Sequence, residues 1–263
     1  MLKNRLRVLI HKLLLPRGRE YKHQTELEDG WDKYFILSGK KSICVLQKDV
    51  QGLSNGIVIL SHPYLAEAKA FYLLRDHAEM YLTQGFGVVM FDFNGFGESP
   101  FVDFDYASDL SAVADYIRQK MPEIPIFGHG VSFGASHTIT YGTRPDNVFH
   151  KIIIENCLDN NLSYYKKRNS KLYLLMRGLM KVFPSVNKDH NYVHTINRLK
   201  NINSALFIYN TGDDLTTIQM GEQLHASCNI HASILIFKGQ HLQAFQKNKN
   251  KYTEDVISFL LRG

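Results

Sequence analysis

The chain has 263 residues, of which 44% are hydrophobic and 21% are charged, as is usual for a globular protein. This composition excludes a disordered chain, a coiled coil and a collagen, and without an 18-residue apolar run it also excludes a polytopic membrane protein. The length suits one large α/β domain. Three scattered cysteines, Cys44, Cys157 and Cys228, match neither a disulfide framework nor a C-x-x-C metal site, which favours a cytoplasmic compartment.

The positive charge is concentrated in two segments. Residues 1–22 carry seven basic residues and one acid, and residues 158–200 carry nine basic residues and two acids. Both segments are also rich in leucine, whereas a nucleic-acid-binding protein usually spreads its positive charge over a broad face. We therefore expect no nucleic-acid partner and predict peripheral contact with an anionic membrane through both segments.

The first 22 residues predict a basic amphipathic helix. Apolar side chains recur there at helical spacing, at Leu2, Leu6, Leu9, Ile10 and Leu13. His11 and Lys12 interrupt the apolar run and no small-residue cleavage site follows, so we interpret the segment as a retained helix rather than a signal peptide. It either lies on a membrane surface or packs on its own domain.

Strands and helices alternate along the rest of the chain. A hairpin is predicted from strands over residues 33–37 and 42–47, followed by strands over 56–61, 86–91, 124–128, 151–155, 205–209 and 233–237. Helices are predicted over residues 67–83, 106–121, 133–141, 217–226 and 252–261. This alternation predicts one α/β domain over residues 23–263, with a mostly parallel sheet covered by helices on both faces. The basic, aromatic insert at about residues 158–200 is expected to form a small helical lid, which either walls the site or only covers the sheet edge.

The sequence Gly130-Val131-Ser132-Phe133-Gly134 stands between a predicted strand and a predicted helix. This is the G-x-S-x-G pattern of a nucleophile elbow. The backbone turns sharply at Ser132, and side chains two residues to either side would collide, which explains both glycines. The turn places the Ser132 hydroxyl at a helix N-terminus, where the helix dipole favours developing negative charge.

Two further strand ends supply a base and an acid. Asp213-Asp214 follows the strand over residues 205–209, and His241 follows the strand over residues 233–237. In open α/β sheets the chemistry lies beyond the carboxyl ends of the strands, so we expect these side chains to meet Ser132. A serine hydroxyl needs an imidazole to take its proton and a carboxylate to orient that imidazole.

These motifs resemble those of the α/β-hydrolase superfamily in its serine-hydrolase branch, from about residue 56 to the C-terminus. The sequence Asp92-Phe93-Asn94-Gly95-Phe96-Gly97-Glu98-Ser99 resembles the D-x-R-G-x-G-x-S loop of the superfamily, with Asn94 in place of arginine. Ser61-His62-Pro63-Tyr64 resembles its His-Gly turn, with Pro63 in place of glycine, and Gly239-Gln240-His241 resembles its Gly-x-His turn. The position of the lid is similar to that in the lysophospholipase and serine-aminopeptidase-like subgroup.

The resemblance implies roles for individual residues. Ser132 would be the nucleophile, His241 the base and Asp214 the acid, with Asp213 as the alternative acid. The mechanism would need neither a metal nor an organic cofactor.

The resemblance also implies an oxyanion hole made of two backbone N–H groups. These would belong to Phe133 and Tyr64, with Leu65 as the alternative to Tyr64. By their position in the sequence, His62 and His129 flank the site. We expect them to be structural, with support of the site as the alternative.

The sequence therefore predicts a serine hydrolase, carboxylesterase- or lipase-like, that cleaves lipophilic acyl esters through an acyl-enzyme. An acyl thioesterase and an aminopeptidase or amidase stay open, because the same triad serves them. An alternative of another class is a hydrolase fold that binds without catalysis, against which the complete triad argues. A dinucleotide site, a P-loop and an H-E-x-x-H zinc site have no support in the sequence.

Overall fold

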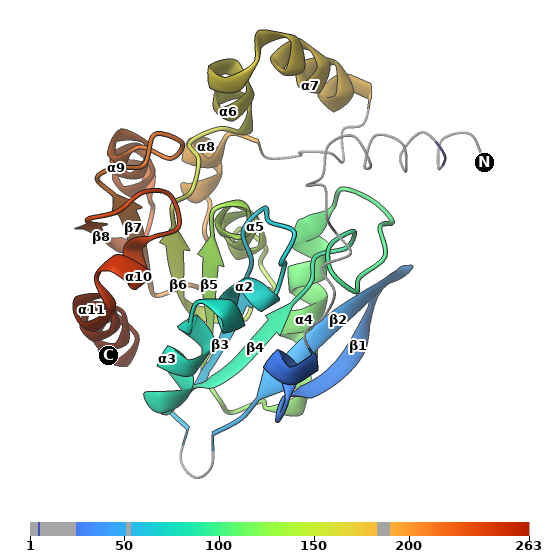
Figure 1. The fold of residues 1–263 in the computed structure, drawn as a ribbon, viewed down its shortest axis with the longest axis vertical. Helices are drawn as coiled ribbons and strands as arrows, with labels where there is room; N and C mark the ends of the chain where they lie inside the picture. The colour runs from blue at the N-terminus through green and yellow to red at the C-terminus, as the bar shows by residue number, and fades with distance from the viewer. Residues whose placement is uncertain (1–4, 6–24, 51–53, 183–189, 263) are drawn as a thin grey trace.

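The computed structural model describes residues 5, 25–50, 54–182 and 190–262. In this part of the chain eight strands form one sheet, in the order β1-β2-β4-β3-β5-β6-β7-β8 (Figure 1). The strands are β1 (Asp32–Ser38), β2 (Lys41–Lys48), β3 (Ile57–Ser61), β4 (Gly87–Phe91), β5 (Ile126–Val131), β6 (Phe149–Glu155), β7 (Ser204–Asn210) and β8 (His231–Phe237). The helix predicted over residues 1–22 lies outside the described residues, apart from Arg5.

The strand pairing confirms the mostly parallel sheet. Strands β1 and β2 form the predicted hairpin and add to the edge of β4 as antiparallel strands, whereas all pairs from β4 through β8 are parallel. Strands β3 and β4 are buried on both faces, as their continuous apolar runs predict.

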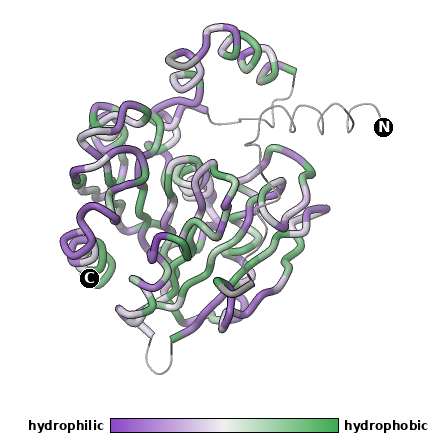
Figure 2. The backbone as a smooth tube through the Cα atoms, viewed as in Figure 1, coloured by the Kyte–Doolittle hydropathy of each residue, from purple (hydrophilic) through white to green (hydrophobic). Residues whose placement is uncertain are grey.

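Helices cover both faces of the sheet. They are α2 (Ala70–Leu74), α3 (His77–Thr83), α4 (Tyr106–Lys120), α5 (Phe133–Gly142), α6 (Asn161–Arg168), α7 (Ser170–Val182), α8 (Tyr192–Ile196), α9 (Ile218–Ser227), α10 (Ala244–Lys247) and α11 (Lys249–Leu261), with a 3-10 turn, η1 (Thr25–Glu28). One core joins the sheet to α4, α5, α8 and α9, and the other joins it to α2, α3, α10 and α11. Figure 2 shows the strands between these layers as a hydrophobic centre.

The single helix predicted over residues 67–83 is two helices. Asp76 separates α2 from α3 and adopts a left-handed conformation, with φ of 57°. The short polar side chain of aspartate tolerates this conformation, and neither glycine nor proline marks the break in the sequence. Both pieces still bury an apolar side, so the hydrophobic periodicity runs across the break.

Helices α6 and α7 occupy the predicted lid and lie beyond the carboxyl ends of β5 and β6 (Figure 1). Asn160 caps α6, since its side chain accepts a hydrogen bond from the N–H of Leu162 at 2.8 Å. Helix α8 packs instead against α5 and α9, where Ile196 is buried. Within the described residues, none of the helices is long and apolar enough to cross a bilayer.

Candidate active site

Ser132 sits in a strained turn between β5 and α5. Its φ is 53° and its ψ is −110°, a backbone conformation that residues other than glycine rarely adopt. A Cβ added to Gly134 would lie 1.8 Å from the Ser61 carbonyl oxygen, and one added to Gly130 would lie 2.6 Å from the Cα of Ala135. The elbow therefore depends on both glycines, for the reason that the sequence predicts.

The imidazole of His241 reaches Ser132 from the turn after β8. Its Nε2 lies 3.0 Å from Ser132 Oγ, and its Nδ1 lies 2.6 Å from Asp213 Oδ2. Because Nδ1 donates to the carboxylate, Nε2 is left as the acceptor of the hydrogen bond from the Ser132 hydroxyl. Three segments that are far apart in the sequence thus form one hydrogen-bonded chain.

The prediction that Asp214 is the acid is wrong. Its neighbour Asp213, the predicted alternative, is the carboxylate that contacts His241. Asp213 is 5% exposed, whereas Asp214 is exposed to solvent. The N–H groups of Leu215 and Thr216 donate to Asp213 Oδ1 at 2.8 and 2.9 Å and fold the turn around this carboxylate. The side chain of Asp213 is thereby directed toward His241.

The Asp213 carboxylate is buried but well supplied with donors. Burial alone would raise its pKa, but the hydrogen bond and charge of His241, together with Thr216, outweigh that effect and hold the pKa below its usual value. Asn156, directly after β6, donates from Nδ2 to Asp213 Oδ2 at 3.0 Å. These contacts keep the carboxylate ionised and fixed in one orientation.

The two predicted oxyanion donors are the N–H groups of Phe133, at the start of α5, and of Tyr64, in the turn after β3. Phe133 is the first residue of α5, so its N–H has no partner within the helix. The N–H of Leu65, the alternative donor, is engaged by the Pro63 carbonyl at 2.8 Å. The ring of Tyr64 packs edge to face on that of Phe133, with centroids 5.5 Å apart.

His62 orients the peptide that carries the Tyr64 N–H. Its Nδ1 lies 2.8 Å from the Pro63 carbonyl oxygen, and its Nε2 accepts from the N–H of Phe93 at 3.1 Å. Burial lowers the pKa of His62 to about 4, so the ring is neutral and suits both contacts. In a trans peptide the N–H points opposite to the carbonyl, so the N–H of Tyr64 points away from His62.

His129 supports the elbow from below rather than from the pocket. Its Nδ1 lies 2.8 Å from the Tyr81 hydroxyl, and its Nε2 lies 3.2 Å from Glu155 Oε2. The backbone carbonyl of Glu155 accepts the N–H of Ser132 at 2.8 Å. The buried network of His129 and Glu155 is therefore linked to Ser132 through the backbone of Glu155.

Two buried lysines that the sequence analysis missed hold the loop over residues 92–99. Lys69 Nζ lies 2.8 Å from Asp92 and 2.9 Å from Glu98, within a cluster that also includes Cys44. Lys69 thus pairs with both carboxylates of the cluster, and Lys33 Nζ adds a second positive charge 3.0 Å from Glu98 Oε2. Such a contact between distant segments leaves no local sequence signal.

The second lysine, Lys41, compensates for the asparagine that replaces the arginine of the loop. Asn94 Nδ2 donates to Asp109 Oδ2 at 2.7 Å, while Lys41 Nζ lies 2.8 Å from Asp109 Oδ1. Burial raises the pKa of Asp109 to about 6, although Lys41 and Asn94 oppose this shift. Lys41 therefore supplies the positive charge beside this loop.

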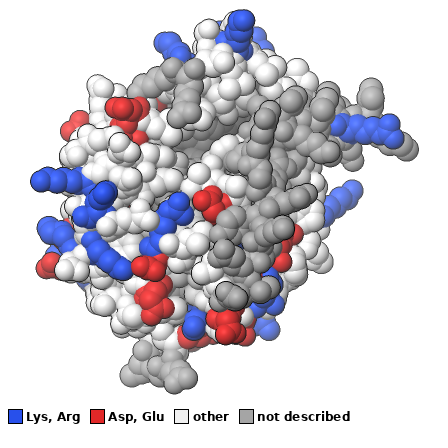
Figure 3. Space-filling view, in the orientation of Figure 1, with Lys and Arg blue, Asp and Glu red and all other residues white. Residues whose placement is uncertain are grey.

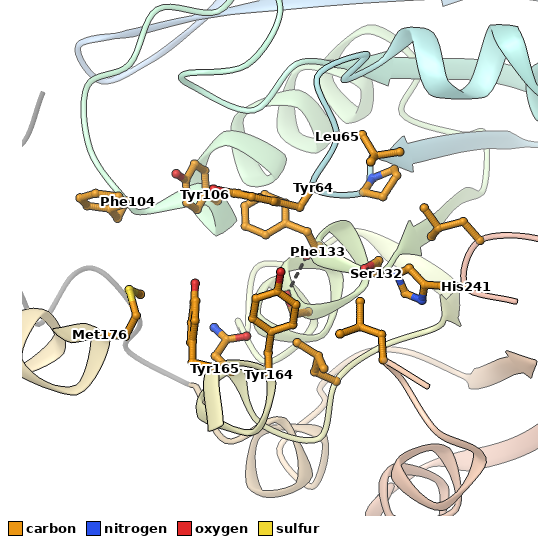
Figure 4. A pocket seen from close by; sticks show the side chains of 16 residues that line it. Tyr64, Leu65, Phe104, Tyr106, Ser132, Phe133, Tyr164, Tyr165, Met176 and His241 are labelled. Atoms are coloured by element: carbon orange, nitrogen blue, oxygen red, sulfur yellow. Dashed lines mark hydrogen bonds between the residues drawn. The ribbon is translucent and has the colours of Figure 1, made fainter. Parts of the chain in front are cut away.

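A cavity of about 240 Å³ opens beside Ser132 and His241 (Figure 4). It is bounded by the turn over residues 63–65, the start of α5 and the helices α6 and α7. Its lining residues are mostly apolar or aromatic: Pro63, Tyr64, Leu65, Phe104, Tyr106, Ser132, Phe133, Ser136, Leu158, Asn161, Tyr164, Tyr165, Met176, Leu215, His241 and Leu242. Asp and Glu are absent from this lining, as far as the described residues show.

Comparison with known proteins adds a family and a fold. The sequence profile of the family "Serine aminopeptidase, S33" matches residues 54–225. An esterase of Pyrococcus furiosus superposes with a TM-score of 0.71 at 20% identity, over 94% of this chain and 96% of the other. A monoacylglycerol lipase of Paleococcus ferrophilus superposes with a TM-score of 0.66 at 19% identity, over 82% and 98%. An esterase of Exiguobacterium antarcticum gives 0.64 at 14% identity, over 88% and 100%. Curated proteins give no match to the sequence.

Proposed function

The chain belongs to the serine aminopeptidase S33 family, a hydrolase family with the α/β-hydrolase fold, and we propose that it cleaves carboxylic esters of lipophilic acyl groups. The predicted resemblance and fold class are thereby confirmed. The observation that carries the proposal is the hydrogen-bonded chain Ser132–His241–Asp213 beside an apolar cavity. An activated hydroxyl beside an apolar cavity suits acyl transfer from an ester to water.

In the proposed reaction Ser132 Oγ attacks the ester carbonyl carbon while His241 Nε2 takes the hydroxyl proton. The carbonyl oxygen becomes an oxyanion, which the N–H groups of Phe133 and Tyr64 stabilise, each by about 3–4 kcal/mol. His241 then returns the proton to the leaving alcohol as the tetrahedral intermediate collapses. Water repeats the sequence on the acyl-enzyme, with His241 again as base, and releases the carboxylic acid.

The lining of the cavity favours an ester over the substrate of an aminopeptidase. A free α-ammonium group needs a carboxylate or an equivalent acceptor when it is buried. The described lining residues include hydroxyl, amide and imidazole groups but no carboxylate. The named neighbours, two esterases and a monoacylglycerol lipase, also act on esters by their names.

Purified protein tests the proposal with matched p-nitrophenyl esters, acyl thioesters and aminoacyl amides. We expect kcat/KM to be highest for an ester and to be lost in Ser132→Ala, whose circular dichroism and thermal unfolding stay as in the wild type. Equal rates for wild type and Ser132→Ala would refute the catalytic assignment. No turnover by correctly folded wild type would favour the binding-module alternative, and preference for a thioester or an amide would replace the ester.

We also propose that the protein contacts an anionic lipid surface through the outward side of α7. Leu174, Leu175 and Val182 are 64%, 52% and 68% exposed. Exposed basic residues flank them, namely Lys171, Arg177 and Lys181. Figure 3 shows lysine and arginine side chains projecting at the end of the molecule where α6 and α7 lie. Apolar groups bordered by positive charge are typical of helices that lie on anionic membranes.

Vesicle sedimentation tests this contact. Wild type should sediment with phosphatidylglycerol-containing vesicles and less with pure phosphatidylcholine, and Leu174→Ser/Leu175→Ser/Val182→Ser should lower the bound fraction. A protein without residues 1–22 tests the second predicted segment separately. Equal binding of wild type and the triple variant would remove α7 from the contact.

A further inference from the structure

The cavity is a channel with the hydrogen-bonded chain at one end. In Figure 4, Ser132 and His241 lie at one side of the cavity, while Phe104 and Met176 lie at the other. One wall is a run of aromatic rings, Tyr64, Phe133, Tyr106 and Phe104, with successive centroids 5.5, 5.0 and 6.4 Å apart. A straight apolar group that starts at Ser132 would follow this wall.

The opposite wall comes from the lid. Tyr164 and Tyr165 of α6 pack edge to face, with centroids 5.0 Å apart, and both line the cavity. The space between the two aromatic walls is therefore apolar along its length, which suits an acyl chain.

Met176 closes the far end from α7. It is 5% exposed, whereas its neighbour Leu175 is 52% exposed and points outward. Among the described residues of α7, Met176 is the one that lines the cavity, and Figure 4 places it opposite Phe104, which is 7% exposed. Met176 and Phe104 thus form the end wall of the cavity. The two aromatic walls run from Ser132 to this end wall.

The volume sets the length of the chain that fits. A protein cavity of roughly 150 Å³ holds one benzene molecule, that is, about six carbon atoms. By the same packing, 240 Å³ holds about ten non-hydrogen atoms. The carboxyl group uses two or three of these, which leaves an acyl chain of about eight carbons in all.

We infer that the cavity is the acyl site, that it selects medium-length chains of about eight carbons, and that Met176 sets the upper limit. This inference rests on the proposed ester hydrolysis and adds the substrate class and a specificity-determining residue. Longer chains meet the Met176 side chain, and shorter chains leave part of the apolar wall uncovered.

The experiment measures kcat/KM for p-nitrophenyl esters from acetate to palmitate. Wild type should have its optimum near octanoate. Shortening the end wall in Met176→Ala should admit about two more methylene groups, each worth about fourfold when buried. The ratio of kcat/KM for laurate to that for octanoate should therefore rise about fifteenfold. Met176→Trp should move the optimum to shorter chains, and Gly178→Ala, in the same helix but outside the cavity lining, should leave the profile as in the wild type.

Two further experiments test the acyl assignment and the role of Met176 separately. An octanoate series with lengthening alcohol chains tests which half of the ester the cavity holds, and a response of this series to Met176→Ala, in place of the acyl series, would overturn the acyl assignment. Met176→Leu, close to methionine in volume, should keep the wild-type profile. Unchanged acyl profiles in both Met176→Ala and Met176→Trp, with native thermal unfolding, would also overturn the inference.

Binding is measured independently of turnover. Calorimetry on Ser132→Ala should show tighter binding of octanoate than of palmitate, and Met176→Ala in the same background should narrow that difference. If wild type cleaves no ester but this preference holds, the proposed reaction fails while the inferred chain selectivity stands. If esters are cleaved and palmitate binds as tightly as octanoate, the chain selectivity fails while the proposed reaction stands.

Discussion

Asn156, the residue directly after β6, donates a hydrogen bond of 3.0 Å to Asp213, the acid that follows β7. Asn156 itself has φ of 49°, and its backbone N–H donates to the Ile208 carbonyl at 2.8 Å. Two adjacent strand ends therefore fix one carboxylate. This relationship explains why the acid is Asp213 and not its neighbour.

Replacement of the two adjacent aspartates gives opposite results. Asp213→Asn should lower kcat by about 10⁴-fold, because His241 Nδ1 loses its carboxylate partner. Asp214→Asn, one residue further along in solvent, should stay within about twofold of wild type. The measurement is kcat for the best p-nitrophenyl ester, and a larger loss in Asp214→Asn than in Asp213→Asn would reverse the assignment.

Removal of the Asn156 side chain should cost less than removal of the acid. Asn156→Gly keeps the left-handed backbone without strain and deletes one donor to Asp213, so we expect kcat to fall about fivefold. A matched control, Asn201→Gly, replaces an exposed asparagine with φ of 56° outside the site and should keep the wild-type kcat. If Asn156→Gly had full activity, the contact with Asp213 would be structural only.

The elbow glycine and a lid glycine should respond differently to alanine. Gly134→Ala forces a Cβ to within 1.8 Å of the Ser61 carbonyl, so we expect a loss of stability of at least about 3 kcal/mol. Gly178→Ala in α7 meets nothing within 4 Å and should be neutral or stabilise by up to about 1 kcal/mol. Urea unfolding monitored by circular dichroism distinguishes the two variants, and equal midpoints would contradict the close approach at the elbow.

Loss of Lys41 should destabilise the fold through Asp109. Lys41→Met leaves the fully buried carboxylate without its cation and should cost about 3–5 kcal/mol. The double variant Lys41→Met/Asp109→Asn removes both charges and should recover a large part of that loss. A double-mutant cycle by urea unfolding measures the coupling, and additive losses would show that Lys41 does not balance Asp109.

Stability should fall as the pH drops from about 6.5 to 4. Burial lowers the pKa values of His62 and His77 to about 4 and that of His137 to about 3. In this pH range the unfolded chain binds protons on these imidazoles and the folded chain does not, so the free energy of unfolding decreases, by about 1.4 kcal/mol for each unit of pKa difference. Asp109 and Asp115 act in the opposite direction, since burial raises their pKa values and so favours the folded state as the pH falls, but the three imidazoles outnumber them.

His137 offers the cleanest test of this pH dependence. Its buried Nε2 has no hydrogen-bond partner among the described residues, and its ring packs on Phe133 with centroids 4.4 Å apart. His137→Phe should therefore reduce the difference in unfolding free energy between pH 7.5 and pH 5. His194→Gln, at an exposed position, should leave that difference unchanged. A steeper pH dependence in His137→Phe would contradict the account.

Features that arise from contacts close in the sequence could be predicted, whereas features that arise from contacts between distant segments could not. Ser132 and its two glycines were predictable because the elbow is a local steric requirement, and His241 because it follows a clear strand. The choice between Asp213 and Asp214 depends in part on the contact with Asn156, which lies 57 positions earlier in the chain, so the local turn with Thr216 does not decide it. Lys41 lies 53 positions before Asn94, so its compensating charge becomes visible only when the sheet edge is assembled.

The break between α2 and α3 shows the same limit on a smaller scale. Hydrophobic periodicity predicts that residues 67–83 bury one side, and the structure buries Phe71, Tyr72 and Tyr81 as expected. The periodicity does not predict the left-handed backbone at Asp76, and neither a glycine nor a proline marks this position. Burial was therefore predictable, and continuity of the helix was not.

The most direct test of the central claim is intact-mass and peptide mass spectrometry after reaction with an alkyl fluorophosphonate. We expect one adduct per chain, located on the peptide that contains Ser132. Labelling should be prevented by prior incubation with an octanoyl inhibitor and should be absent from Ser132→Ala. An adduct that persists in folded Ser132→Ala, or one found on another residue of the wild type, would contradict a nucleophile at Ser132.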